Sequence, residues 1–147
     1  MRTTDIILAA LAGTTTFTAF SYLVSKKMDK DFEEPELLGK MVEVIPGMEE
    51  KEAAFTGWAI HYLTGIVFAS SFKALISITG MKPTIRNGMI VGAASGLPAA
   101  LAWDKALRSH PSPPRKPSMN YYMHLALGHV IFGATSFFVF GLFNKNR

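Results

Sequence analysis

Three histidines lie inside long apolar stretches of this 147-residue chain, and they are the side chains best placed to do chemistry there. They are His61, His124 and His129, and Asp104 stands at the end of another apolar stretch. Ionisable residues are costly inside a membrane, so they mark either a functional site or a buried hydrogen bond. Because histidine titrates near neutral pH, such residues could move protons, bind a small ligand or ligate a metal.

The simplest interpretation of the histidines is structural. His61 lies four residues after Gly57 and four before Gly65, and His129 lies four residues before Gly133. Residues four apart share one face of a helix, so each histidine belongs to a face of small residues. Such faces bring helices close together in lipid, and polar side chains on them hydrogen-bond to the neighbouring helix.

Two functional interpretations remain open beside the structural one. A pair formed by His61 with either His124 or His129 could ligate haem b between helices, although two histidines without a wider spacing signature are weak evidence. Alternatively, a proton or a small ligand could pass along a polar pocket. The residues of this candidate pocket are His61, Tyr62, Asp104, His124 and His129.

Geometry limits both functional interpretations. His124 and His129 are five residues apart, which separates them by about 140° around a helix, so they cannot both point into one site. Asp104 has a simpler explanation, because Arg108 follows it at the i+4 position and could pair with it.

The elements that must position these residues are long apolar segments. Four stretches contain no Asp, Glu, Lys or Arg: 6–24, 53–72, 87–103 and 118–144. A helix needs roughly 20 such residues to cross a bilayer, and the stretches lack the alternation of barrel strands. We therefore predict an all-α fold, a bundle of four transmembrane helices over about 6–24, 53–78, 87–106 and 118–143. The chain forms one domain.

A short amphipathic helix is expected in the loop between the first two spans. Apolar residues recur there at helical spacing after Pro35, and Pro46 with Gly47 ends the pattern. Glu33 and Glu34 suit the N-terminus of this helix because they face the positive end of its dipole. The prediction is a helix lying on the membrane surface, with a solvated linker as the alternative.

A cleavable signal peptide is the alternative to a membrane span for the N-terminal segment. Cleavage after the Ala-Leu-Ala run at 10–12 would leave an apolar core of about five residues, shorter than the roughly seven that a signal peptide needs. An uncleaved membrane anchor is the better interpretation.

Glycines mark the faces where helices should pack closely. Gly88, Gly92 and Gly96 form two overlapping G-x-x-x-G motifs in the third span. Together with Gly57, Gly65 and Gly133, they are the predicted helix-packing positions. We expect the third span to use this face against partner helices or a second copy of the chain.

The composition of the chain excludes several kinds of functional site. The chain has no cysteine, so disulfides, thiolate metal sites and a cysteine nucleophile are excluded. The net charge of +4 belongs to loops beside a membrane and gives no reason to expect nucleic acid as a partner. No metalloprotease, serine-hydrolase, P-loop or dinucleotide motif is present, so we assign no catalytic residue and no metal ligand.

Aromatic and basic residues indicate the topology. With four spans, every Trp and Tyr falls on one membrane side: Tyr22, Trp58, Tyr62, Trp103, Tyr121 and Tyr122. The same side holds nine of the 15 Lys and Arg residues. The positive-inside rule therefore places loops 25–52 and 107–117 in the cytoplasm.

The chain resembles small four-helix bacterial inner-membrane proteins of an uncharacterised family. The resemblance rests on Pro35-Glu36-Leu37-Leu38-Gly39, His61-x-x-x-Gly65, the small-residue third span and His129-x-x-x-Gly133. His124 and the proline-rich loop depart from the pattern. The resemblance implies the fold and the bacterial inner membrane, but it brings no activity and no catalytic residue.

The sequence thus predicts a multi-pass membrane protein of non-enzymatic role, a helix-packing subunit or a self-associating component. Its expected partners are the lipid bilayer and either copies of itself or subunits of a membrane complex. The alternative function is handling of a small ligand, a proton or haem in the histidine-lined pocket, within the membrane leaflet on the aromatic side.

Overall fold

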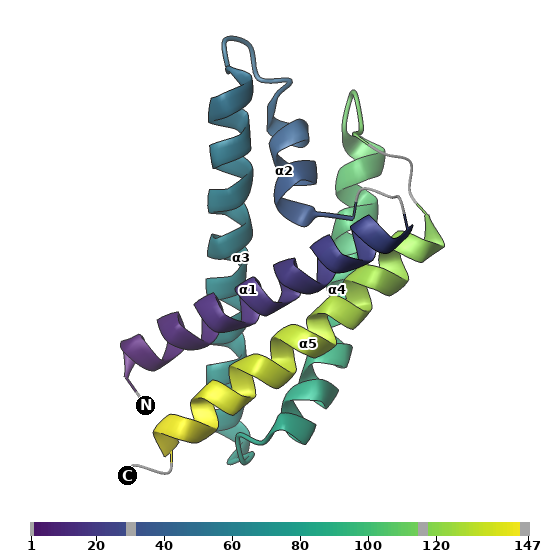
Figure 1. Ribbon diagram of the computed structural model, residues 1–147. Coiled ribbons are helices and arrows are strands. Elements are labelled where there is room, and N and C mark those ends of the chain that lie inside the picture. Colours follow the sequence, from purple (N-terminus) through teal and green to yellow (C-terminus); the bar gives the residue numbers. More distant parts are fainter. Residues whose placement is uncertain (1, 29–31, 115–117, 145–147) are drawn as a thin grey trace.

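The computed structural model describes residues 2–28, 32–114 and 118–144, and within these ranges the chain is helical with no strands. Its helices are α1 (Thr3–Met28), α2 (Glu34–Val42), α3 (Glu50–Thr79), α4 (Ile85–Ser109) and α5 (Met119–Asn144) (Figure 1). The all-α prediction is confirmed for the part of the chain that the structure describes.

Three of the helices, α1, α3 and α5, are long and apolar enough to cross a membrane, as expected of an integral membrane protein. α1 and α3 contain the predicted spans 6–24 and 53–78, and α5 differs from the predicted span 118–143 by one residue at each end. The predicted span 87–106 lies in α4, which is not one of the three. α4 contains polar residues, such as Asn87 and Ser95, and three glycines within its predicted span, so the four-span bundle is not confirmed by helix length and composition.

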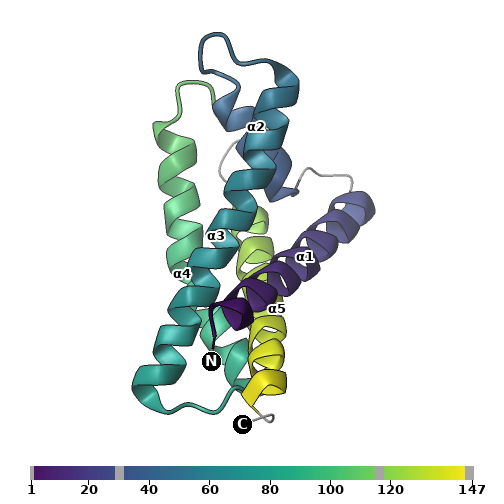
Figure 2. The same ribbon diagram turned by 90° about the vertical axis from the view of Figure 1, so that its left-hand side faces the viewer.

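The helices pair in an order that differs from their order in the chain. α5 packs against both α1 and α4, while α3 packs against α1 and α2. α1 and α5 run antiparallel and bring both ends of the chain to the same end of the molecule (Figures 1 and 2). The consecutive helices α3 and α4 pack mainly against these other helices, which leaves space between them.

The expected short helix between the first two spans is present as α2, with Pro35 in its first turn. It lies along the first half of α3 (Figure 2). Gly39 and Gly57 meet at this contact, since a side chain on Gly57 would clash with the carbonyl of Pro35 and the backbone of Gly39. The helix is therefore held by α3, and its placement on a membrane surface stays a prediction.

The main core lies where α1, α3 and α5 meet. It consists of small and aromatic side chains: Ala9, Ala10, Phe17, Ala69, Phe72, Ile76, Leu125, Phe132, Phe137 and Phe140. A smaller cluster of Phe32, Leu37 and Tyr121 joins the start of α2 to the start of α5.

The glycine face of α4 packs against α5 of the same chain. A side chain on Gly88 would meet the backbone of Gly133, one on Gly92 would meet the carbonyl of His129, and one on Gly96 would meet Ala126. All three α4 glycines are buried. This finding corrects the expectation that the third span offers its glycines to a partner helix, because the chain covers that face itself.

Candidate functional site

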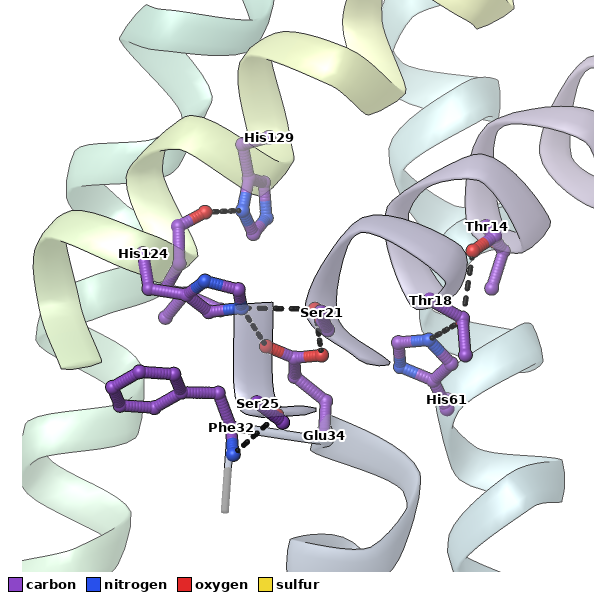
Figure 3. Close-up of polar contacts among 10 residues, drawn as sticks. Thr14, Thr18, Ser21, Ser25, Phe32, Glu34, His61, His124 and His129 are labelled. Carbon is purple, nitrogen blue, oxygen red and sulfur yellow. Dashed lines mark hydrogen bonds and ion pairs between the residues drawn. The ribbon is translucent and has the colours of Figure 1, made fainter. Parts of the chain in front are cut away.

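A buried polar cluster joins three helices. Ser21 of α1 donates a hydrogen bond of 2.8 Å to Oε2 of Glu34 in α2, and its Oγ lies 2.9 Å from Nε2 of His124 in α5 (Figure 3). The same Nε2 is 3.5 Å from Oε1 of Glu34. Because the three side chains are 0%, 2% and 4% exposed, the cluster is isolated from solvent.

Aromatic rings fix the orientation of His124. Phe20 and Phe32 stack on its imidazole, each with ring centroids 4.9 Å away, at interplanar angles of 5° and 14°. The backbone N–H of Phe32 donates to Oγ of Ser25 at 3.0 Å, which holds the segment before α2 against α1 (Figure 3). His124 therefore has a fixed position in the packing of α1, α2 and α5.

The hydrogen bonds of Ser21 determine which nitrogen of His124 carries a proton. A serine hydroxyl has one hydrogen, and Ser21 donates it to Glu34. Nε2 of His124 must then donate to Ser21, while Nδ1 has no hydrogen-bond partner among the described residues. In a hydrolytic triad the carboxylate binds the other ring nitrogen, Nδ1, so this cluster has the wrong connectivity for such catalysis.

His61 is positioned by α1. The hydroxyl of Thr18 donates to the backbone carbonyl of Thr14 at 2.8 Å, and it lies 2.9 Å from Nε2 of His61. Since the only hydrogen of Thr18 is used on the carbonyl, Nε2 of His61 is the donor in its bond with Thr18. A neutral His61 then presents Nδ1 as a hydrogen-bond acceptor.

His129 is held by its own helix. Its Nδ1 lies 2.8 Å from the carbonyl of Leu125, and because a carbonyl can only accept, Nδ1 carries the hydrogen (Figure 3). The rings of Phe17 and Phe68 meet the imidazole edge-on at centroid distances of 5.4 and 5.0 Å. A neutral His129 therefore presents Nε2 as an acceptor.

A cavity of about 310 Å³ lies between α3 and α4, with wall residues from all five helices. Its wall consists of Thr14, Phe17, Glu34, Leu38, His61, Thr64, Gly65, Phe68, Pro98, Ala99, Ala102, Trp103, Leu125, His129 and Phe132. The wall residues Thr64, Pro98 and Ala102 are exposed on the outside of the molecule. The cavity therefore opens sideways between α3 and α4, through the gap that these helices leave.

Two buried oxygen atoms on residues of the cavity wall have no hydrogen-bond partner among the described residues. They are Oγ1 of Thr14 and Oε1 of Glu34, and both residues are 2% exposed. A buried polar atom without a partner costs about 1–3 kcal/mol. Protein atoms cover both oxygens, so a small molecule or water in the cavity could supply the missing partner once the side chain turns toward it.

The structure divides the predicted pocket residues into two groups. His61 and His129 lie on the cavity wall, while His124 is tied to Glu34 without lining the cavity. Tyr62 and Asp104 also do not line it. Tyr62 bonds Thr15 at 3.0 Å, and Asp104 pairs with Arg108 and accepts a hydrogen bond of 2.7 Å from Tyr122.

Glu34 and the hydroxyls of α1 are site residues that the sequence reasoning missed. Glu34 was interpreted only as a charge at a helix N-terminus, whereas its side chain is buried and reaches Ser21 and His124. The available signal was a stripe of hydroxyl residues spaced by four, three and four positions: Thr14, Thr18, Ser21 and Ser25. This spacing keeps one face of a helix polar inside an otherwise apolar span.

The arrangement does not favour haem or a metal ion. Nε2 of His61 is bonded to Thr18, and Nε2 of His124 is bonded to Ser21. Ligation of haem through these nitrogens would break both contacts between helices. Within the part of the chain that the structure describes, no three His, Asp or Glu residues gather closely enough to hold a metal ion.

Comparison with known proteins does not assign the chain to a family. No protein-family model, curated protein or solved structure matches the chain. The resemblance to small bacterial inner-membrane proteins stays a hypothesis drawn from sequence motifs, and the function must be argued from the cavity itself.

Proposed function

We propose that this chain is a non-enzymatic, four-span protein of the bacterial inner membrane that binds a small amphipathic molecule in the cavity between α3 and α4. The ligand enters sideways from the bilayer, where the wall residues Thr64, Pro98 and Ala102 are exposed. Its polar end meets Thr14 and Glu34, and its apolar part contacts the aromatic wall.

The fourth span in this proposal is α4. Its 25 residues would extend about 37 Å at 1.5 Å per residue, which exceeds the roughly 30 Å of a bilayer core. Its charged residues stand near the two ends, with Arg86 at one and Asp104, Lys105 and Arg108 at the other. The α4 glycines face α5 rather than lipid, so a low apolar content is compatible with a membrane position.

The observation that carries the proposal is the pairing of an open cavity with buried oxygens that lack partners. A binding pocket for a small molecule is mostly apolar, holds a few polar groups and occupies about 300–1,000 Å³. The present cavity, at about 310 Å³, has this character and lies at the lower end of the range. Thr14 and Glu34 supply polar atoms that a ligand would satisfy.

The other functions considered from the sequence have less support. Self-association through the third span loses its main argument, because the glycines of α4 are covered by α5. A proton path through His61, Asp104 and His124 would need these groups in a chain, yet Asp104 is bonded to Arg108 and Tyr122 instead. His61 is bonded to Thr18.

The test uses Trp103, which lines the cavity, as a reporter. The chain has two tryptophans, so Trp58→Phe leaves Trp103 as the only one. The protein in lipid nanodiscs is titrated with 8-bromooctan-1-ol, whose bromine quenches tryptophan fluorescence on contact. We expect quenching that saturates, because the ligand fills a defined site.

Two variants of α4 make the test specific. Ala99→Leu adds bulk to the cavity wall and should abolish saturable quenching, whereas Ala94→Leu adds the same bulk on an exposed part of α4 outside the wall and should leave it unchanged. Quenching that rises linearly with ligand in the bilayer and ignores Ala99→Leu would overturn the proposal.

A further inference from the structure

We propose that the cavity selects a lipophilic amine, a ligand whose polar end is positively charged and donates hydrogen bonds. This inference rests on the proposed function and specifies the ligand class. It follows from counting the hydrogen-bond donors, acceptors and charges that the wall presents.

Glu34 supplies the charge. Its Oε2 accepts from Ser21, and its Oε1 lies 3.5 Å from the protonated Nε2 of His124. A proton on Oε1 would lie close to the hydrogen on Nε2 of His124, and two donor hydrogens repel each other. Oε1 therefore acts as a hydrogen-bond acceptor. It still lacks a hydrogen-bond partner among the described residues. A donor in the cavity would complete the coordination of this carboxylate once the Glu34 side chain turns toward it.

The histidines and one threonine of the wall also present acceptors. His61 donates its ring hydrogen to Thr18, and His129 donates its ring hydrogen to the carbonyl of Leu125. In the neutral rings, Nδ1 of His61 and Nε2 of His129 are therefore acceptors. Thr64 uses its hydroxyl hydrogen on the carbonyl of Ile60 at 2.8 Å. Its oxygen can then only accept.

The donors of the wall are few and neutral. Among the described wall residues, the donors that are not used within the chain are the hydroxyl of Thr14 and the indole N–H of Trp103, and none of these residues is Lys or Arg. A carboxylate or phosphate ligand would therefore meet an acidic side chain and no compensating positive charge. A ligand rich in acceptors would leave the acceptors of Glu34, His61 and His129 without partners.

Aromatic residues add a second source of attraction for a cation. Phe17, Phe68, Phe132 and Trp103 line the same cavity. The face of an aromatic ring attracts an ammonium group within about 6 Å, and the attraction increases when water is excluded. A carboxylate beside aromatic rings in an apolar cavity offers an amine both partners at once.

The cavity volume limits the ligand. About 310 Å³ corresponds to the volume of about ten water molecules at roughly 30 Å³ each. The site therefore holds an amine head and a short apolar segment, and the remaining chain extends through the opening between α3 and α4 into the bilayer.

The test compares matched ligands on the Trp58→Phe protein in nanodiscs. The probes are 8-bromooctylamine, 8-bromooctan-1-ol and 8-bromooctanoate, which share the chain and the bromine and differ in the polar end. Quenching is plotted against the concentration of each probe in the bilayer, which is measured with protein-free nanodiscs. We expect the amine to bind at least tenfold more tightly than the alcohol, and the carboxylate to bind most weakly.

A variant of Glu34 locates the selectivity. Glu34→Gln removes the charge but can still accept from Ser21, so it should lower the ratio of amine affinity to alcohol affinity from at least tenfold to about one. Glu36→Gln is the matched control, because Glu36 is exposed on the same helix and lies outside the cavity wall. The control should bind all three probes like the parent protein.

A fourth probe tests hydrogen-bond donation without changing the protein. (8-Bromooctyl)trimethylammonium keeps the positive charge but has no N–H group, so we expect it to bind more weakly than the primary amine. Equal binding of the two cations would overturn the hydrogen-bond part of the inference, even if Glu34→Gln failed to fold.

The outcomes separate this inference from the proposed function. If none of the probes gives saturable quenching, the proposed function itself fails. If the alcohol binds as tightly as the amine, or the carboxylate binds most tightly, the cavity is a binding site but its selectivity for amines is wrong.

Discussion

The contact between α4 and α5 and the contact among α1, α2 and α5 hold helices together by different means. The first brings backbones together at Gly88, Gly92 and Gly133. The second uses side-chain hydrogen bonds among Ser21, Glu34 and His124. Only the second leaves polar atoms without partners beside a cavity.

The glycine contact can only stabilise the fold, whereas the polar contact can also take part in binding a ligand. A glycine contact in lipid depends on van der Waals packing of backbones and needs no polar partner, so it can be complete within the chain. A polar cluster must satisfy every donor and acceptor to be stabilising, and a cluster that is only partly satisfied is costly. Glu34 of this cluster is only partly satisfied, and the hydroxyl of the nearby wall residue Thr14 has no partner among the described residues, so a ligand in the cavity could complete both.

The largest effect is expected from breaking the polar contact. Glu34→Ala removes the partner of both Ser21 and His124, and it should lower the free energy of unfolding by about 3 kcal/mol because breaking a buried pair leaves polar groups uncompensated. Thermal unfolding in detergent, followed by circular dichroism, measures the loss. Glu36→Ala on the exposed side of α2 is the control and should unfold like the parent. A matching loss in both variants would contradict the role of the cluster.

The next effect is expected from the glycine contact. Gly92→Leu places a side chain against the carbonyl of His129 and should destabilise the chain by about 2 kcal/mol through overpacking. The oligomeric state of the variant should be that of the parent, because α5 of the same chain covers this face and no contact between copies depends on it. Unfolding and size-exclusion chromatography with light scattering measure the two quantities. Ala93→Leu, on an exposed position of α4, is the control. Normal stability with a lost oligomer would restore the glycine face as a contact between copies.

A smaller loss is expected where His61 meets α1. Thr18→Val removes the oxygen that accepts from Nε2 of His61 and leaves that buried N–H without its partner. The expected destabilisation is about 1.5 kcal/mol. Thr4→Val, at an exposed position of the same helix, should change stability little. Denaturation of both variants in the same detergent decides the comparison, and equal stability would show that the bond with His61 contributes nothing.

The smallest effect should have the opposite sign. Thr14→Val replaces a buried hydroxyl that has no partner by a methyl group of similar size, so it should stabilise the protein without ligand by about 1 kcal/mol. The same variant should weaken the binding of 8-bromooctan-1-ol. Melting temperatures with and without ligand measure both changes. A loss of stability without ligand would mean that the Thr14 hydroxyl already has a partner.

Much of the fold followed from the sequence because long apolar segments have few alternatives in lipid. The helices over 6–24, 53–78 and 118–143 follow from long apolar stretches, of which only 53–78 includes a charged residue, Lys73, near its end, and the short helix after Pro35 follows from its spacing. The glycine positions were predicted as packing sites, but not the helix they contact. A G-x-x-x-G face shows that a backbone comes close and does not identify that backbone.

The site was predicted less completely. His61 and His129 were identified because a histidine in an apolar segment is conspicuous. Glu34 was assigned to a membrane-surface helix, since local sequence cannot show that a loop carboxylate folds back against His124, 90 residues later in the chain. The partner of Ser21 could not be predicted for the same reason.

The sequence alone determined the helical character of this protein and its apolar segments, because hydrogen bonding in lipid leaves a helix as the simplest solution for each segment independently. The tertiary structure decided which helices touch, since α3 and α4 follow each other in the chain yet pack mainly elsewhere. It also decided that Glu34, His61 and His129 share one cavity. That cavity depends on the joint packing of five helices, and no single segment encodes it.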